Sequence, residues 1–321
     1  MRIFDDFVRD NPRVEIISND GRPTPIPRTW RPILGDSDIL VAIPDMHMFH
    51  YNSNLDNFKY GAESMLDFLV HCEIVQRQLF CEGRSLKLYQ LGDLYELRFP
   101  NSLSNGRATS REIRRSHPLY AAIIRQMGVL NPCLIYGNHD WEHRHHPGFR
   151  ESARNGQVYM EHGYSADRWY HFTNPELPGW NQVMTVFKTL RRVEASLADM
   201  RRAWLRLPEY RHVAYGVVSG ELEISHYPEE STYPDRQISH FTSLLRRFRS
   251  HGNPARVCLV AHTHHPFIDP EFDDGRSIYI DAGAWTDGRS DFVVITNEEA
   301  AVCRYRRAAS VEVALGYRTA V

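Results

Sequence analysis

The chain has 321 residues, 42% of them hydrophobic and 24% charged, and a formal net charge of −2. This length allows one large globular domain or two smaller ones, and the near-neutral charge gives no overall basic field for nucleic acid. Five scattered cysteines without a CxxC pair argue against a disulfide framework or a zinc finger. No run approaches the roughly 20 apolar residues of a membrane span, and no signal peptide is found, so we expect a soluble, cytoplasmic protein.

Residues 1–37 are rich in Pro, Arg and Asp and predict an N-terminal arm, extended on the domain or partly loose. From residue 38 a single domain is expected to run to residue 321. Short apolar runs there end in polar residues, and their β-branched and aromatic content predicts buried strands. The runs are ILVAIPDMH (39–47), LKLYQLGD (86–93), PCLIYGNHD (132–140), QVYMEHG (157–163), RVCLVAHTHH (256–265) and SIYIDAGAW (277–285).

Between the first runs, residues 62–80 and 118–127 have apolar side chains at helical spacing, with Pro118 in a first turn. Strands that alternate with helices predict an α/β fold around a central sheet. After residue 290, DFVVIT and AVCRYRR predict an antiparallel hairpin.

Residues 164–212 interrupt this alternation and predict a helical insertion, and a further helix is expected at about 235–249. The insertion has apolar residues at three- and four-residue steps and a basic opposite face. It is either a lid that attracts an anionic or lipid-linked substrate, or a helix that packs on the body and exposes its arginines to solvent.

Polar side chains at the ends of five predicted strands carry the functional signal. In open α/β sheets, sites form at the carboxyl ends of the strands, so these side chains are expected to meet in one region. Carboxylate, imidazole and amide ligands suit Mn, Fe or Zn. Seven such groups exceed the needs of one ion and favour two ions that share a carboxylate. The seven are Asp45, His47, Asp93, Asn138, His162, His262 and His264.

Each motif alone has an ordinary structural explanation, and the combination in this order is what carries weight. DMH, GDLYE, GNHD, EHG and AHTH resemble the DxH, GDxx[DE], GNH[DE], His-Gly and GHxH motifs of the calcineurin-like metallophosphoesterase superfamily. The resemblance covers about residues 38–296. It implies a central mixed β-sandwich flanked by helices. Ala261 departs from the usual glycine, and Tyr164 stands where relatives often carry His or Asp.

The resemblance also implies roles for individual residues. One metal would take Asp45, His47, Asp93 and His264, and the other would take Asp93, Asn138, His162 and His262. His139 would be the general acid or transition-state stabiliser, oriented by Asp140. Two divalent ions are expected, Mn²⁺ first and Fe or Zn as alternatives. They would activate a water for attack on phosphorus.

The expected activity is hydrolysis of a phosphomonoester, phosphodiester or pyrophosphate bond in a phosphorylated small molecule or nucleotide. Alternatives within the class are a protein phosphatase, a nucleic-acid phosphodiesterase or a UDP-sugar-lipid pyrophosphatase. Outside the class, a non-catalytic scaffold would keep the fold and bind proteins. Nucleic acid is not indicated by the charge, and no residue pattern bears on the oligomeric state.

Residues around the predicted site are candidates for substrate contacts. Arg98 and Arg107 could bind phosphate, because arginine forks match its oxygens, and a solvated helix start is the alternative. Tyr164 and His143 are further candidates. His143, His145 and His146 exceed what two metals require.

Overall fold

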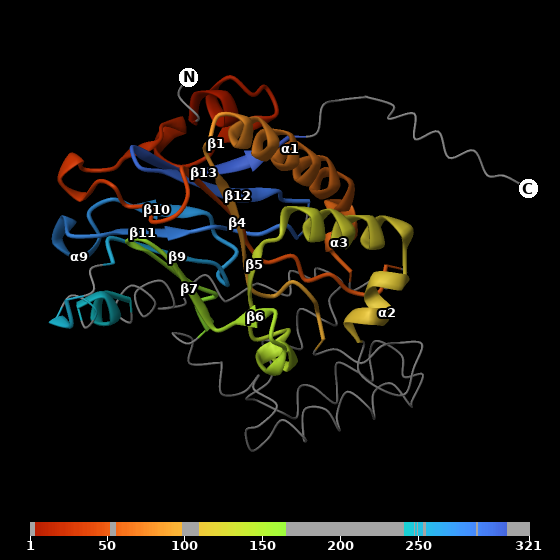
Figure 1. Cartoon of the computed structure of the whole chain (residues 1–321). Coiled ribbons are helices and arrows are strands. Elements are labelled where there is room, and N and C mark those ends of the chain that lie inside the picture. Colours follow the sequence, from red (N-terminus) through yellow and green to blue (C-terminus); the bar gives the residue numbers. More distant parts are fainter. Residues whose placement is uncertain are drawn as a thin grey trace, which may run out of the picture.

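The computed structural model describes residues 4–51, 56–97, 109–164 and 241–306, apart from positions 247, 249, 253, 254 and 287. In these residues the protein is a mixed α/β structure with two mixed sheets and several helices (Figure 1). Each of the six predicted apolar runs contains a strand, so those strand predictions are confirmed.

The first sheet has eight strands in the order β1-β13-β12-β3-β4-β5-β6, with β2 paired to β13. β3 to β6 are parallel, and β12 with β13 forms the predicted antiparallel hairpin beside β3. The segment expected as an N-terminal arm contributes β1 and β2 to this sheet. The strands are β1 (Val14–Ile16), β2 (Thr24–Pro25), β3 (Ile39–Ile43), β4 (Leu86–Leu91), β5 (Cys133–Ile135), β6 (Phe149–Arg150), β12 (Asp291–Thr296) and β13 (Glu299–Tyr305).

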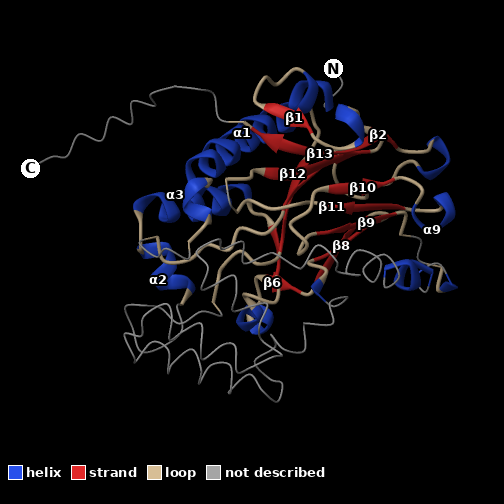
Figure 2. Ribbon diagram, turned by 180° about the vertical axis from the view of Figure 1, so that it is seen from behind, coloured by secondary structure: helices blue, strands red, loops and turns tan. Residues whose placement is uncertain are grey.

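The second sheet has five strands in the order β10-β11-β9-β8-β7. Its three central strands are parallel, and both edge strands are antiparallel to their neighbours. Figure 2 shows both sheets from behind, with the helices α1 and α3 at one side. The strands are β7 (Ser152–Asn155), β8 (Val158–Glu161), β9 (Val257–Val260), β10 (Phe267–Asp269) and β11 (Ile278–Asp281).

The wholly apolar sequence of β3 is explained by burial on both faces, as expected for a parallel strand inside a domain. Ile39, Val41 and Ile43 belong to a core cluster that includes α1 and α3. The alternate residues Leu40 and Ala42 belong to a second cluster, shared with β8, β9 and β11. Buried side chains of the two sheets therefore meet in one core.

The helices of the first core begin and end close to the predicted positions. α1 (Ala62–Cys81) and α3 (Pro118–Leu130) correspond to the expected helices at 62–80 and 118–127. α3 begins after His117, whose ring accepts the Leu119 N–H, and ends before Asn131 in the left-handed conformation. The short elements are α2 (Ser110–Arg115), α9 (Phe272–Gly275), η1 (Asp5–Arg9), η2 (Asn19–Gly21), η3 (Arg28–Trp30), η4 (Phe58–Tyr60) and η5 (Trp141–His145).

The predicted insertion at 164–212 lies outside the described residues, except for Tyr164. Of the helix expected at 235–249, residues 241–246 are described and helical. In the described part of the chain, no helix combines the length and the apolar character that crossing a membrane requires.

Candidate metal centre

The seven predicted ligands come from the ends of five strands that belong to both sheets. Asp45 and His47 follow β3, Asp93 follows β4, and Asn138 follows β5. In the second sheet, His162 follows β8, and His262 and His264 follow β9. All of these strands are parallel to a neighbour, so their carboxyl ends meet at one edge of the structure.

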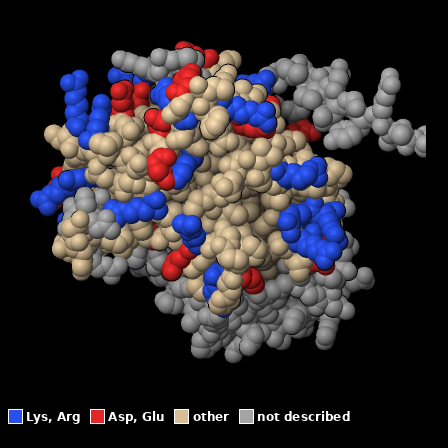
Figure 3. Space-filling view, in the orientation of Figure 1, with Lys and Arg blue, Asp and Glu red and all other residues tan. Residues whose placement is uncertain are grey.

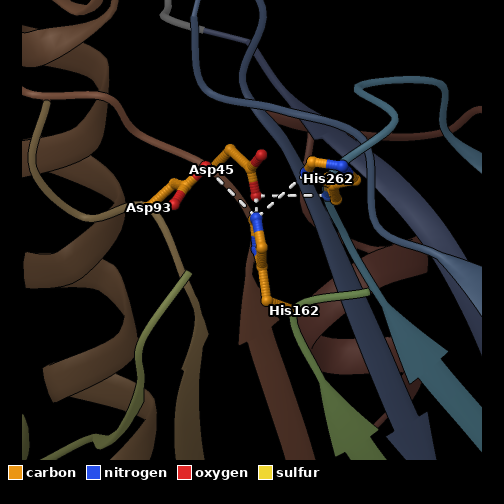
Figure 4. A group of neighbouring side chains, drawn as sticks. All are labelled: Asp45, Asp93, His162 and His262. Atoms are coloured by element: carbon orange, nitrogen blue, oxygen red, sulfur yellow. Dashed lines mark hydrogen bonds and ion pairs between the residues drawn. The ribbon is translucent and has the colours of Figure 1, made fainter. Parts of the chain in front are cut away.

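Six of these seven side chains, together with His139, form three overlapping groups in which each group's ligand atoms lie within 4.8 Å of one another. Figure 4 shows the first group, in which the side chains point toward a common centre. Every member of that group is buried. The groups are Asp45, Asp93, His162 and His262; then Asp45, His47 and His264; then His47, Asp93 and His139.

Asp45 is placed between two of these groups. Its Oδ2 lies 2.9 Å from His264 Nε2 and 3.7 Å from His47 Nε2. Its Oδ1 lies 3.5 Å from His162 Nδ1 and 3.4 Å from the His262 backbone nitrogen. The resemblance implies Asp93 as the shared carboxylate, and the structure places Asp45 in an equally central position.

Asp93 and His162 form the centre of the first group. His162 Nε2 lies 3.1 Å from both Asp93 Oδ2 and Asn138 Oδ1. Its Nδ1 lies 2.9 Å from the Leu91 carbonyl oxygen, which can accept only if this nitrogen carries the proton. That contact leaves Nε2 free as a ligand atom, the usual arrangement for a metal-binding histidine.

Two observations show that these side chains fit a cation. The ring nitrogens of His47 and His264 approach to 3.2 Å, and so do those of His162 and His262. Two facing ring nitrogens can form a hydrogen bond only when one of them carries a proton. A cation between them can accept the lone pairs of both. In addition, Asp93 Oδ2 is buried and accepts no hydrogen bond from the described residues, although His162 Nε2 lies 3.1 Å from it.

The backbone at the cluster adopts an uncommon conformation. φ is 46° at His47, 50° at Asp93, 78° at His262 and 59° at His264. This left-handed region costs residues with a Cβ about 1–3 kcal/mol each, and such residues concentrate at functional sites. The surrounding structure must therefore hold four of the candidate ligands in place.

Two glycines permit the close packing of the cluster. A Cβ on Gly137 would lie 2.0 Å from Asp93 Oδ1, and one on Gly92 would lie 2.5 Å from the His162 ring. Gly92 also has a φ of 107°. Both positions therefore require the absence of a side chain, which explains the glycine in the GD and GNHD motifs.

The charges in the cluster shift the pKa values in opposite directions. Burial raises the pKa of Asp45 and Asp93, but the nearby histidines, His162 first, outweigh burial and lower both pKa values. Burial lowers the pKa of His162, but the Asp93 and Asp45 carboxylates outweigh it and raise this pKa to about 9. The carboxylates thus favour a positive charge in their midst, which a proton or a metal ion can supply.

The structure places a different carboxylate from the predicted one beside His139. We expected Asp140 to orient this ring, but Asp140 accepts hydrogen bonds from backbone N–H groups, those of Gly137 at 2.7 Å and Leu94 at 2.9 Å. It thereby ties the GNHD turn to the GD turn. The carboxylate on His139 Nδ1 is that of Glu96, which also lies 3.3 Å from His47 Nδ1.

The candidate substrate-binding residues and the additional histidines do not all lie next to the clustered ligands. Tyr164 is buried, with its ring 5.8 Å from that of His162. His143 lies outside the clustered ligands and stacks on Phe149 at 4.3 Å, where burial lowers its pKa to about 4. His145 and His146 are exposed. Arg98 and Arg107 lie outside the described residues.

Sequence reasoning gave no role to four polar residues that contact the centre. In the sequence, the only indication for Glu96 was its place as the final acidic residue of the GDLYE motif. Asp281 ends β11, Thr286 and Arg289 follow it, and all three contact the turn that carries His262 and His264. No signal in the sequence distinguishes these three from ordinary loop residues.

Comparison with known proteins gives no family. No family model matches the chain, and no curated protein matches it.

Proposed function

We propose that this protein is a binuclear metal-dependent phosphoesterase of the calcineurin-like superfamily. The observation that supports it is the convergence of two buried carboxylates and four histidines from both sheets, in overlapping groups with facing ring nitrogens. The core shared by the two sheets also agrees with the β-sandwich that this superfamily implies.

The chain's own residues define where the ions would bind. Asp45, His47 and His264 would hold one ion, and Asp93, His162 and His262 with Asn138 would hold the other, with Asp45 or Asp93 shared. Bound ions would supply Lewis acidity, which offsets the charge of a phosphate ester and lowers the pKa of water. Mn²⁺ suits the mixture of carboxylate, imidazole and amide ligands, as do Fe and Zn.

His139 is the proposed proton-transfer group. The Glu96 carboxylate on Nδ1 holds the proton of the ring at that atom. Proton transfer to a substrate would therefore take place at Nε2. Burial raises the pKa of Glu96, but the charge of His139 outweighs burial and lowers it to about 2. Glu96 is therefore ionised at neutral pH and favours a protonated His139, which could donate from Nε2 to a leaving oxygen.

The substrate is proposed as a phosphorylated small molecule or a nucleotide. On the face drawn in Figure 3, basic side chains occur in separate groups with acidic ones among them. This distribution and the net charge of −2 favour a compact substrate over a long nucleic acid. The scaffold alternative is disfavoured because every ligand position and His139 are retained.

Metal analysis coupled to a hydrolysis panel tests the proposal. Purified protein with Mn²⁺ is assayed on an aryl phosphomonoester, an aryl phosphodiester, nucleoside pyrophosphates and single-stranded DNA. We expect two bound ions and turnover of at least one substrate. Bound metal with no turnover of any substrate would favour the scaffold instead.

Variants of the proton-transfer pair add a second test. His139→Ala should lower kcat about 10²- to 10⁴-fold while metal still binds, and Glu96→Gln should lower it by a smaller factor in the same direction. His145→Ala is a matched control, because this histidine is exposed in the same loop. Full activity of H139A would show that the assigned role is wrong.

A further inference from the structure

The turn that carries His262 and His264 receives polar contacts from the last residue of β11 and from the residues that follow this strand. We propose that Asp281, Thr286 and Arg289, called the brace residues below, are positioning residues that hold this turn in its metal-binding conformation. This inference rests on the proposed metal centre and adds residues to it that do not themselves belong to the clustered ligands.

Asp281 holds the middle of the turn. The Thr263 hydroxyl, between the two histidines, donates to Asp281 Oδ2 at 2.7 Å. The Gly283 N–H donates to the other carboxylate oxygen at 3.1 Å. Asp281 and Thr263 are both buried, so water cannot replace this hydrogen bond without rearrangement.

Arg289 and Thr286 hold the end of the turn. Arg289 Nη1 donates to the His264 carbonyl oxygen at 2.5 Å. The Thr286 hydroxyl lies 3.5 Å from His264 Nδ1, on the side of the ring away from Asp45. Both contacts favour the orientation in which His264 Nε2 faces the carboxylate of Asp45.

The turn needs such support because both of its histidines have left-handed backbone, with φ of 78° and 59°. A residue with a Cβ does not favour the left-handed conformation on its own, so contacts with neighbouring residues must stabilise it. The same stretch of chain also fixes Asp45, since the Trp285 N–H donates to the Asp45 carbonyl oxygen at 2.8 Å. Asp45 and His264 therefore share one support.

Loss of the brace residues should affect the two ions unequally. Arg289 and Thr286 contact His264, and the Trp285 N–H holds Asp45. Both ligands share a group with His47, whereas His262, at the start of the turn, belongs to the other group. His162 has a support outside the brace residues, because its Nδ1 lies 2.9 Å from the Leu91 carbonyl oxygen. One ion should therefore bind more weakly, by about 10- to 100-fold, the usual effect of removing a residue that orients a metal ligand.

The test compares matched variants by titration calorimetry with Mn²⁺ on the full chain. Thr263→Val removes the donor to Asp281, and Arg289→Gln removes the guanidinium from the His264 carbonyl. Thr296→Val is the control for threonine, because Thr296, at the end of β12, is about as buried as Thr263 and its hydroxyl donates to the Glu299 carbonyl oxygen. Arg256→Gln is the control for arginine, because Arg256 Nη1 donates to the Arg276 carbonyl at 3.1 Å.

We expect two binding steps in the wild type and both controls, and one weakened step in T263V and R289Q. Arg289→Lys should restore part of the affinity, because an ammonium can still donate to the carbonyl. The d–d spectrum of the Co²⁺-loaded protein should change in T263V and R289Q but not in the controls. Thermal melting of the metal-free protein shows separately whether each variant is folded. If T263V does not fold, R289Q still tests the proposal.

Three outcomes overturn parts of the inference in distinguishable ways. Unchanged affinities and spectra in folded T263V and R289Q would refute the brace and leave the proposed function intact. Equal weakening of both steps would refute the assignment to one ion. A wild-type protein that binds no divalent metal would refute the proposed function, and the brace with it.

Discussion

Gly137 lies so close to the Asp93 carboxylate that a single methyl group at this residue should disturb the centre. Its Cβ would approach Asp93 Oδ1 to 2.0 Å and the Asp93 backbone nitrogen to 2.7 Å. Gly137→Ala is therefore expected to lower the free energy of unfolding by about 1–3 kcal/mol, the range for overpacking. It should also abolish tight Mn²⁺ binding, as measured by calorimetry.

Gly128 provides the control for this substitution. It lies within α3, and a Cβ there would meet nothing within 4 Å. Gly128→Ala should raise the free energy of unfolding by about 0.5–1 kcal/mol, because alanine is the better helix former. If G137A bound metal as tightly as G128A, the close approach to Asp93 would have no functional consequence.

At the level of single residues, the sequence predicted the clustered ligands but not their neighbours. A motif names the residue types at a strand end, and parallel strands bring those ends together whatever the intervening loops do. The choice between Asp140 and Glu96 as partner of His139 depends on side-chain direction within two turns, which the sequence does not encode locally. Asp140 is adjacent in sequence, yet its carboxylate is used by backbone N–H groups.

The secondary-structure elements were predicted well where periodicity and burial agreed. The strand β3 and the helix α1 have unambiguous apolar patterns, and both occur within a few residues of the expected bounds. Short strands such as β2, β6 and β7 were not predicted, because two to four residues carry too little pattern. Their existence depends on partners that are distant in sequence.

A buried carboxylate beside α3 predicts a pH dependence of stability. Asp56 is fully buried, and Tyr120 of α3 donates its hydroxyl to Asp56 Oδ2 at 2.5 Å. Burial raises the pKa of Asp56 from 3.8 to about 6, against the lowering effect of the Tyr120 hydrogen bond. The folded protein therefore holds this proton more tightly than the unfolded chain does. Protonation of Asp56 therefore contributes about 3 kcal/mol to the free energy of unfolding below about pH 4. This contribution is lost as the pH rises from about 4 to 6.

Asp56→Asn removes this titration while its side-chain oxygen can still accept from Tyr120. The free energy of unfolding of D56N, relative to that of the wild type, should be lowest at about pH 4 and should rise by up to about 3 kcal/mol by pH 7. Urea unfolding across this range measures the difference, and titrations in the candidate metal centre cancel because both proteins share them. Tyr120→Phe should steepen the dependence by removing the hydrogen bond that lowers the pKa. A difference that is constant with pH would contradict the assignment to Asp56.

At the scale of the whole molecule, the candidate centre joins the two sheets. Asp45, His47 and Asp93 come from the first sheet, whereas His162, His262 and His264 come from the second. Direct contacts already connect them, including the bridge between Asp45 and Ala284. Without a cation, however, the facing histidine nitrogens at 3.2 Å and the buried Asp45 and Asp93 carboxylates oppose close approach of the two strand edges.

Metal removal should therefore destabilise the entire protein and not only inactivate it. If the proposed ions bind the folded state alone, a free concentration of 100 times Kd stabilises it by about 2.7 kcal/mol per site, so chelation followed by buffer exchange should lower Tm by roughly 5–10 °C. Differential scanning fluorimetry with and without added Mn²⁺ measures this shift. H139A should keep the full shift, since His139 is assigned to proton transfer, whereas Asp93→Asn should lose most of it. If Tm did not respond to Mn²⁺ in the wild type, the two sheets would be held at this edge by their direct contacts alone, and the clustered side chains would have to satisfy one another through protons on the histidines.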